Sequence, residues 1–185
     1  MFVVGAASSA EIIALEVDRD QRMIKVRSEI LFDAPRVQVF AALSDYERFE
    51  DLSSRFTASR FLEPAADGTP RVYTRVEGCV LFFCRSVERC ARLQAIAPVE
   101  IEAMAEPESS DVEYGYEHWL LETEGEGTRV IYTHEFDPDF WVPPLLGIWV
   151  IRTALEDDAQ KAANRLELMA QRWHSEDREQ SDYSD

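Results

Sequence analysis

Alternation of apolar and polar side chains predicts a β-strand over residues 24–32. Ile24, Val26, Ile30 and Phe32 fall on one side of this segment together with Ser28, while mostly charged residues occupy the other side. A period of two residues indicates a strand with one buried face. We expect the sheet of this protein to begin here.

Two short helices are predicted after this strand. Asp33 stands where its side chain would cap the first helix, and Pro35 suits a first turn, where the N–H that proline lacks would have no partner. Ser44 and Glu47 have the Ser-x-x-Glu spacing of a capping box, so the second helix is predicted to begin at Ser44.

Strand-like segments then follow one another through short, turn-rich connections. They cover residues 56–63, 71–82, 85–96, 100–106, 114–122 and 128–136. Consecutive strands with short links predict an antiparallel meander. Together with the first strand they would form a sheet of about seven strands.

The C-terminal part of the chain has a helical period. Apolar residues recur at three- and four-residue steps from Leu145 to Trp173, which predicts a helix of roughly 40 Å. The apolar segment Trp141–Leu146 precedes it and contains two prolines. Three interpretations remain for this segment: a lid, a lip that touches a membrane, or a rigid connection packed under the helix.

Length and charge narrow the class of protein. The 185 residues suggest one domain over residues 22–174, with an N-terminal segment at 1–21 and an acidic, disordered tail at 175–185. A net charge of −17 repels phosphate backbones and anionic membrane surfaces. We therefore expect no nucleic-acid partner and at most a transient membrane contact, while the oligomeric state stays open.

The N-terminal residues leave the compartment open. An apolar run followed by Ser8, Ser9 and Ala10 resembles the end of a signal peptide, without the basic start and long apolar core of a complete one. A signal-peptide remnant would place the protein in the periplasm. A short N-terminal extension would leave it in the cytoplasm.

Three cysteines, Cys79, Cys84 and Cys90, lie in one stretch. An odd number argues against a complete disulfide framework, and the spacing is not that of a zinc site. Cys79 and Cys84 would lie across a strand-to-strand turn. The sequence does not decide whether these two cysteines form a disulfide.

A family resemblance rests on three parts of the sequence: Asp33–Phe40 followed by Leu43–Phe49, then Gly127–Tyr132, then Pro138–Leu145. They resemble the opening, the last strand and the helix entry of the polyketide cyclase/coenzyme Q-binding-protein branch of the START-like (SRPBCC, helix-grip) superfamily. The resemblance implies an α+β fold with a curved antiparallel sheet wrapped around the long C-terminal helix. It also implies an apolar cavity between them that holds a lipid, a quinone or a polyketide.

Candidate ligand-binding residues follow from the faces of the last two strands. Tyr132, His134 and Phe136 share one face of the last strand, and the charges opposite indicate that this face looks inward. In the preceding strand both faces carry apolar groups. The resemblance favours Trp119 and Leu121 inward.

Polar candidates on the same inner surface raise the question of their partners. Glu117 would turn inward with its strand, and His134 would either donate a hydrogen bond to a ligand carbonyl or be satisfied by a neighbour. Arg152, on the apolar stripe of the long helix, would pair with Glu117 or extend to solvent, and Arg89 poses the same question. Trp141 is a further ligand-binding candidate from the apolar segment.

No motif for catalysis, metal binding or a cofactor is found: the Gly-x-Ser-x-Gly elbow, the Gly-rich phosphate loop and HExxH are all absent. The first hypothesis is therefore a non-catalytic binder or carrier of an apolar small molecule. The second is a polyketide cyclase or hydrolase that uses His134, Glu117 or Tyr132 as acid or base. The third, also from the resemblance, is a ribosome-associated interaction module.

Overall fold

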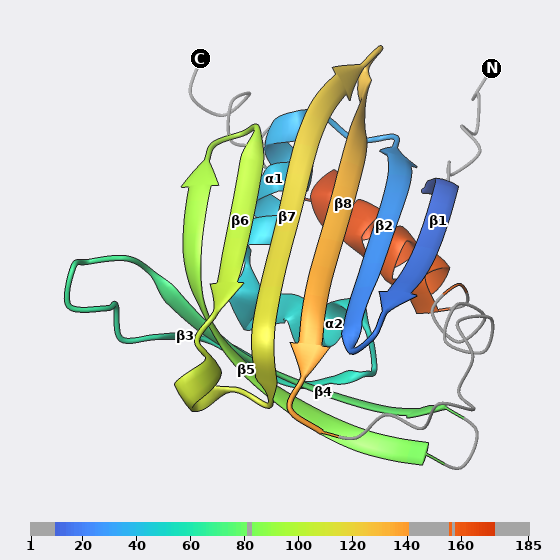
Figure 1. Cartoon of the computed structure of the whole chain (residues 1–185). Coiled ribbons are helices and arrows are strands. Elements are labelled where there is room, and N and C mark those ends of the chain that lie inside the picture. The colour runs from blue at the N-terminus through green and yellow to red at the C-terminus, as the bar shows by residue number, and fades with distance from the viewer. Residues whose placement is uncertain (1–9, 81–82, 141–155, 157, 173–185) are drawn as a thin grey trace, which may run out of the picture.

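One antiparallel sheet runs through the fold (Figure 1). The computed structural model describes residues 10–80, 83–140, 156 and 158–172. Strands β3 to β8 pair in sequence order as a meander, and β8 pairs with β2, so the order is β1-β2-β8-β7-β6-β5-β4-β3. The strands are β1 (Glu11–Asp20), β2 (Met23–Phe32), β3 (Phe56–Leu62), β4 (Arg71–Val80), β5 (Phe83–Ile96), β6 (Glu100–Ala105), β7 (Val112–Glu124) and β8 (Gly127–Pro138), with the short helix η2 (Pro107–Ser109) after β6. The α+β meander expected from the sequence is confirmed, and the sheet has eight strands within the described residues.

Strand β1 is the element that the sequence analysis left outside the sheet. It pairs antiparallel with β2, placing Val17 opposite Val26, and the connecting turn holds Gln21 at φ 54°. The pairing shifts register between Ile12 and Ala14, so the alternation of apolar and polar residues is broken there. The sheet therefore begins ahead of residue 22, the expected start of the domain.

Short helices connect β2 to β3 and lie against one face of the sheet: α1 (Arg36–Ser44), η1 (Tyr46–Arg48) and α2 (Phe49–Leu52) (Figure 1). We call this the inner face. The predicted cap by Asp33 is wrong, because the residue at the N-cap is Pro35 and no side chain caps the helix. The backbone N–H of Asp33 donates instead to Oε1 of Glu167, at 2.6 Å.

The predicted capping box at Ser44 is also wrong. The Ser44 hydroxyl donates to a carbonyl within α1, and Glu47 reaches the edge strand β3, where it accepts a hydrogen bond from Phe61 N–H at 3.1 Å. Glu50 accepts from Ser59 N–H in the same way, also at 3.1 Å. The two carboxylates therefore occupy donors that an exposed strand edge would offer to another chain.

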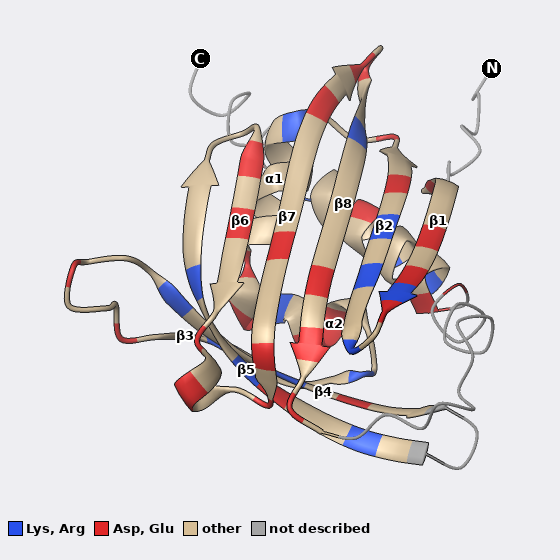
Figure 2. Cartoon of the chain, viewed as in Figure 1, with Lys and Arg blue, Asp and Glu red and all other residues tan. Residues whose placement is uncertain are grey.

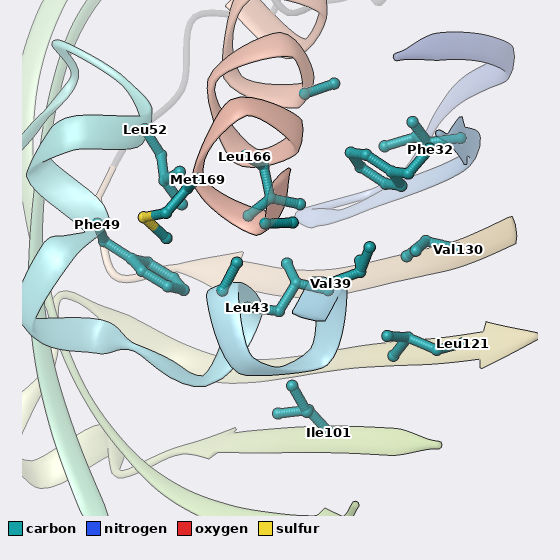
Figure 3. Packing of buried hydrophobic residues seen from close by; sticks show 14 of the residues in the cluster. Phe32, Val39, Leu43, Phe49, Leu52, Ile101, Leu121, Val130, Leu166 and Met169 are labelled. Carbon is teal, nitrogen blue, oxygen red and sulfur yellow. The ribbon is translucent and has the colours of Figure 1, made fainter. Parts of the chain in front are cut away.

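The C-terminal helix lies across the inner face, and its described part covers residues 158–172 (Figure 1). Leu166 points from it toward Leu43 and Val39 of α1, and Met169 lies beside Phe49 and Leu52 of α2 (Figure 3). All of these side chains are buried. Burial of each such side chain contributes about 1.5–3 kcal/mol. The predicted start of this helix at Leu145 lies outside the described residues. Within the described residues, no helix is long and apolar enough to cross a bilayer.

The buried apolar residues of the inner face form two clusters. The larger one packs α1, α2 and the C-terminal helix against the sheet (Figure 3). The smaller one consists of Val17, Ile24 and Val26 on β1 and β2, with Tyr132 and Phe136 of β8 packed against it.

A disulfide joins the two strands of the β4–β5 hairpin. Cys79 and Cys84 lie directly opposite each other in the register, and their sulfur atoms are 2.02 Å apart. Cys90, further along β5, is a free thiol. The disulfide that the sequence left open is thus present in the structure.

Candidate functional site

Polar side chains from several strands meet on the inner face of the sheet. Glu117 of β7 lies directly opposite His134 of β8, and Trp119 lies opposite Tyr132. Leu121 and Val130, the next inward pair along the same strands, are buried in the larger core. The inward orientation expected for these residues follows from this register, because opposite residues project from the same face.

Glu117 forms a buried ion pair with Arg89 of β5. The Arg89 guanidinium donates to Oε2 of Glu117 at 2.7 Å, and the side chains are only 12% and 10% exposed. Arg152, the other arginine considered as a partner of Glu117, lies outside the described part of the chain. Charges removed from water to this degree need both close geometry and further hydrogen bonds.

Tyr132 supplies one of those hydrogen bonds. Its hydroxyl donates to Oε1 of Glu117 at 2.9 Å, so both carboxylate oxygens have a donor. Burial raises the pKa of Glu117, but the Arg89 charge and the hydrogen bonds outweigh it and leave the pKa below its ordinary value. Burial and the nearby Glu117 carboxylate raise the pKa of Tyr132 well above 10. Glu117 is therefore an anion at neutral pH and Tyr132 a neutral donor.

His134 is neutral in this environment. Burial lowers the pKa of its imidazole to about 4, and the opposing effect of Glu117 is smaller. The ring stacks on Phe136 with centroids 4.8 Å apart. A neutral imidazole offers one hydrogen-bond donor and one acceptor.

Tyr46 of η1 adds a hydroxyl that the sequence analysis did not single out. Its side chain is fully buried, stacks on Phe49 with centroids 4.2 Å apart, and its hydroxyl has no hydrogen-bond partner among the described residues. Burial is the main cause that raises the pKa of Tyr46, and the charge of Glu117 raises it further, while the charge of Arg89 acts in the opposite direction. The hydroxyl therefore feels the ion pair, and no sequence motif signals this because the contact depends on how η1 packs on the sheet.

Two further hydroxyl side chains lie beside Arg89, on the strands between it and the β3 edge of the sheet. Thr74 of β4 is opposite Arg89, and Ser59 of β3 is opposite Thr74. Both are buried, and the Ser59 hydroxyl also lacks a partner within the described residues. We call Ser59, Thr74, Arg89, Glu117 and His134 the polar row.

Aromatic side chains border the polar row at its β7–β8 end. The ring centroids of Trp119 and Tyr132 are 4.0 Å apart. Trp119, Tyr132 and Phe136 are all half-buried. Leu121 is only 1% exposed and lies in the larger core, away from the polar row. Trp141, the remaining candidate, lies outside the described residues.

The chemistry of this arrangement favours recognition over proton transfer. Glu117 is held as an anion by two donors, which makes it a weak base, and Tyr132 is a weak acid because its pKa is raised. Arg89, Tyr46 and His134 nevertheless bring hydrogen-bonding groups to an otherwise apolar surface. Ligand pockets typically combine apolar walls with a few such groups.

Known structures with the same fold come from several organisms. A START superfamily protein from Mycobacterium smegmatis has a TM-score of 0.62 at 17% identity, over 78% of this chain and 98% of that one. The Zhui aromatase/cyclase from Streptomyces sp. R1128 has a TM-score of 0.60 at 19% identity, over 81% and 94%. A STAR-related lipid transfer protein from Xanthomonas axonopodis has a TM-score of 0.60 at 15% identity, over 82% and 98%. At these identities the similarity establishes the fold.

No curated protein matches the chain in sequence. The sequence does, however, match a family model. The model described as polyketide cyclase/dehydrase and lipid transport matches residues 23–170, from the start of β2 to the C-terminal helix. The chain therefore belongs to this family and shares the fold of the START superfamily protein.

Proposed function

We propose that this protein binds an apolar small molecule, such as a lipid, a quinone or a polyketide-like compound, without transforming it. The polar end of the ligand, a carbonyl or hydroxyl group, would meet the polar row. Its apolar body would lie against Trp119, Tyr132 and Phe136.

The Arg89–Glu117 ion pair is the observation that carries this proposal. Burying two charges costs several kcal/mol for each ion, and a purely structural core of the same volume would be at least as stable. A guanidinium has five N–H donors, so Arg89 can serve Glu117 and a ligand oxygen together. The pair thus supplies a fixed polar anchor inside an apolar surface.

The Tyr46 hydroxyl supports the same interpretation. A buried hydroxyl without a partner costs about 1–3 kcal/mol. A ligand oxygen placed between Tyr46 and Arg89 would accept hydrogen bonds from both. His134, held neutral, would add a donor or an acceptor according to its tautomer.

Native mass spectrometry tests whether the chain holds a ligand. Protein purified without detergent is expected to carry an apolar compound, and the stripped protein should bind a short-chain quinone, a fatty acid or a hydroxylated polycyclic compound in calorimetry. His134→Phe and Tyr46→Phe should each weaken that binding by about fivefold or more, since each removes one hydrogen-bonding group. The matched control, Tyr114→Phe on the opposite face of β7, should bind like the wild type. A chain that purifies empty and binds none of these compounds contradicts the proposal.

A cyclase or hydrolase is the second candidate function. The observation in its favour is that Glu117 accepts a hydrogen bond from Tyr132 and lies opposite His134 in the strand register. Assays with a polyketide-like substrate would show turnover that disappears in the Glu117→Gln/His134→Phe double variant. Binding without turnover favours the carrier.

A further inference from the structure

The outer face of the sheet, opposite the helices, brings two carboxylates and an imidazole together. Glu100 and Glu102 lie two residues apart on β6 and therefore project from the same face. His118 of β7 lies directly opposite Glu102. One carboxylate oxygen from each glutamate and one ring nitrogen of His118 all lie within 4.8 Å of one another. Figure 2 shows acidic residues on both of these neighbouring strands.

We propose that Glu100, Glu102 and His118 form a binding site for a divalent metal ion of the zinc class. Zinc accepts imidazole nitrogen and carboxylate oxygen at about 2.0–2.2 Å, so small side-chain rotations would bring these atoms onto one ion. Imidazole favours zinc, nickel or copper, whereas a site of oxygen atoms alone favours magnesium or calcium. Three protein ligands leave one tetrahedral position for water.

The imidazole of His118 already points into the cluster. Its Nε2 lies 2.7 Å from Oε1 of Glu100, and the two side chains are 25% and 31% exposed. A metal ion would take the place of the proton in this contact. Because the strand register fixes both backbones, little chain entropy would be lost when the ion binds.

Tyr116 orients a second ligand. Its hydroxyl donates to Oε1 of Glu102, and its ring stacks on that of His118 with centroids 6.2 Å apart. Outer partners of this kind hold metal ligands in position.

The immediate surroundings favour a cation. Gln94 of β5 is opposite Glu102, and Thr133 of β8 is opposite His118, so the two positions that flank the site in this row are uncharged. The next residue of the row, Arg27 of β2, is separated from the site by Thr133. The chain as a whole has a net charge of −17. The site lies on the other face of the sheet from the polar row and does not depend on the proposed ligand.

Titration calorimetry with Zn²⁺ tests the site in the full chain, without a histidine tag and in a Cys90→Ser background that removes the free thiol. One ion should bind per chain near neutral pH and raise the melting temperature. His118→Gln should weaken binding by more than about tenfold, and Tyr116→Phe by about tenfold. Glu122→Gln, which removes an acidic charge from the same face of β7, should leave binding unchanged.

Two results overturn the site. One is a wild-type chain that binds no Zn²⁺. The other is binding that His118→Gln leaves intact or that equimolar Mg²⁺ removes, because both indicate loose attraction to acidic residues. Circular dichroism checks that each variant folds. If His118→Gln does not fold, Glu102→Gln decides by the same criteria.

Discussion

Glu117 organises the inner face at the scale of single residues. Its carboxylate accepts hydrogen bonds from Arg89 and Tyr132, and its charge influences the titration of His134 and Tyr46. Because Glu117 is a buried anion that interacts with several side chains, the loss of any one of these partners should affect the protein. Stability and binding can therefore be tested with the same few substitutions.

Removal of Arg89 alone should be far more harmful than removal of the whole pair. Arg89→Met leaves Glu117 buried without its counter-charge, which should lower the free energy of unfolding by about 3–5 kcal/mol. Arg89→Met/Glu117→Gln should recover most of that loss. Urea denaturation measures both, with Lys25→Met in the exposed Lys25–Glu135 pair as a control that changes little. Equal effects of Arg89→Met and Lys25→Met would show that the pair is not buried in solution.

His134 should make stability depend on pH. Its pKa falls from 6.5 in the unfolded chain to about 4 in the folded protein, so between these values the unfolded state binds the extra proton. Stability should thus decrease by up to about 3 kcal/mol as pH falls through this window. Glu117, whose pKa is also lowered, contributes its loss only below its ordinary value of 4.5.

The matching variant is His134→Phe, and thermal unfolding at several pH values measures the effect. The slope between pH 6.5 and about 4 should be clearly smaller in this variant than in the wild type. An identical slope in both proteins would show that His134 is not held neutral by burial.

At the scale of elements, β1 is the part of the fold that hydrophobic patterning did not reveal. Its register shift near Ile12 breaks the period of two, and half of its residues face solvent at the edge of the sheet. The capping-box pattern failed for a different reason. Glu47 has the right spacing for a local hydrogen bond, yet a donor on β3, distant in sequence, takes its carboxylate.

A charge placed on the inner side of β1 tests whether this strand is part of the folded sheet. Val17 is 6% exposed and packs with Ile24 and Val26, so Val17→Asp would bury a carboxylate without a partner. We expect a loss of more than about 2 kcal/mol in urea denaturation. Asp18→Ala, on the exposed side of the same strand, should change stability by less than about 0.5 kcal/mol. Equal tolerance of both changes would argue against the strand.

The disulfide in the β4–β5 hairpin can be tested by counting free thiols. With Cys79 and Cys84 joined, thiol titration of the denatured, unreduced chain should find one reactive thiol, that of Cys90. After reduction it should find three, the number of cysteines in the sequence. Three thiols before reduction of protein prepared under oxidising conditions would contradict the disulfide.

At the scale of the whole molecule, the sequence predicted the order of elements better than the groups that meet across them. Alternation identified β2, and strand-like segments joined by turn-rich connections identified the meander. It could not pair Arg89 with Glu117, since β6 lies between their strands and the contact depends on side-chain reach across the sheet. The Glu100, Glu102 and His118 cluster was likewise hidden, because it becomes visible only when the register of β6 and β7 is known.

A crystal structure of the protein purified without detergent tests the central claim most directly. The account predicts electron density for an apolar molecule on the inner face, with its polar end within hydrogen-bonding distance of Arg89, Tyr46 or His134. Side chains that fill the space between the sheet and the C-terminal helix, leaving no room for a small organic molecule beside the polar row, would contradict it.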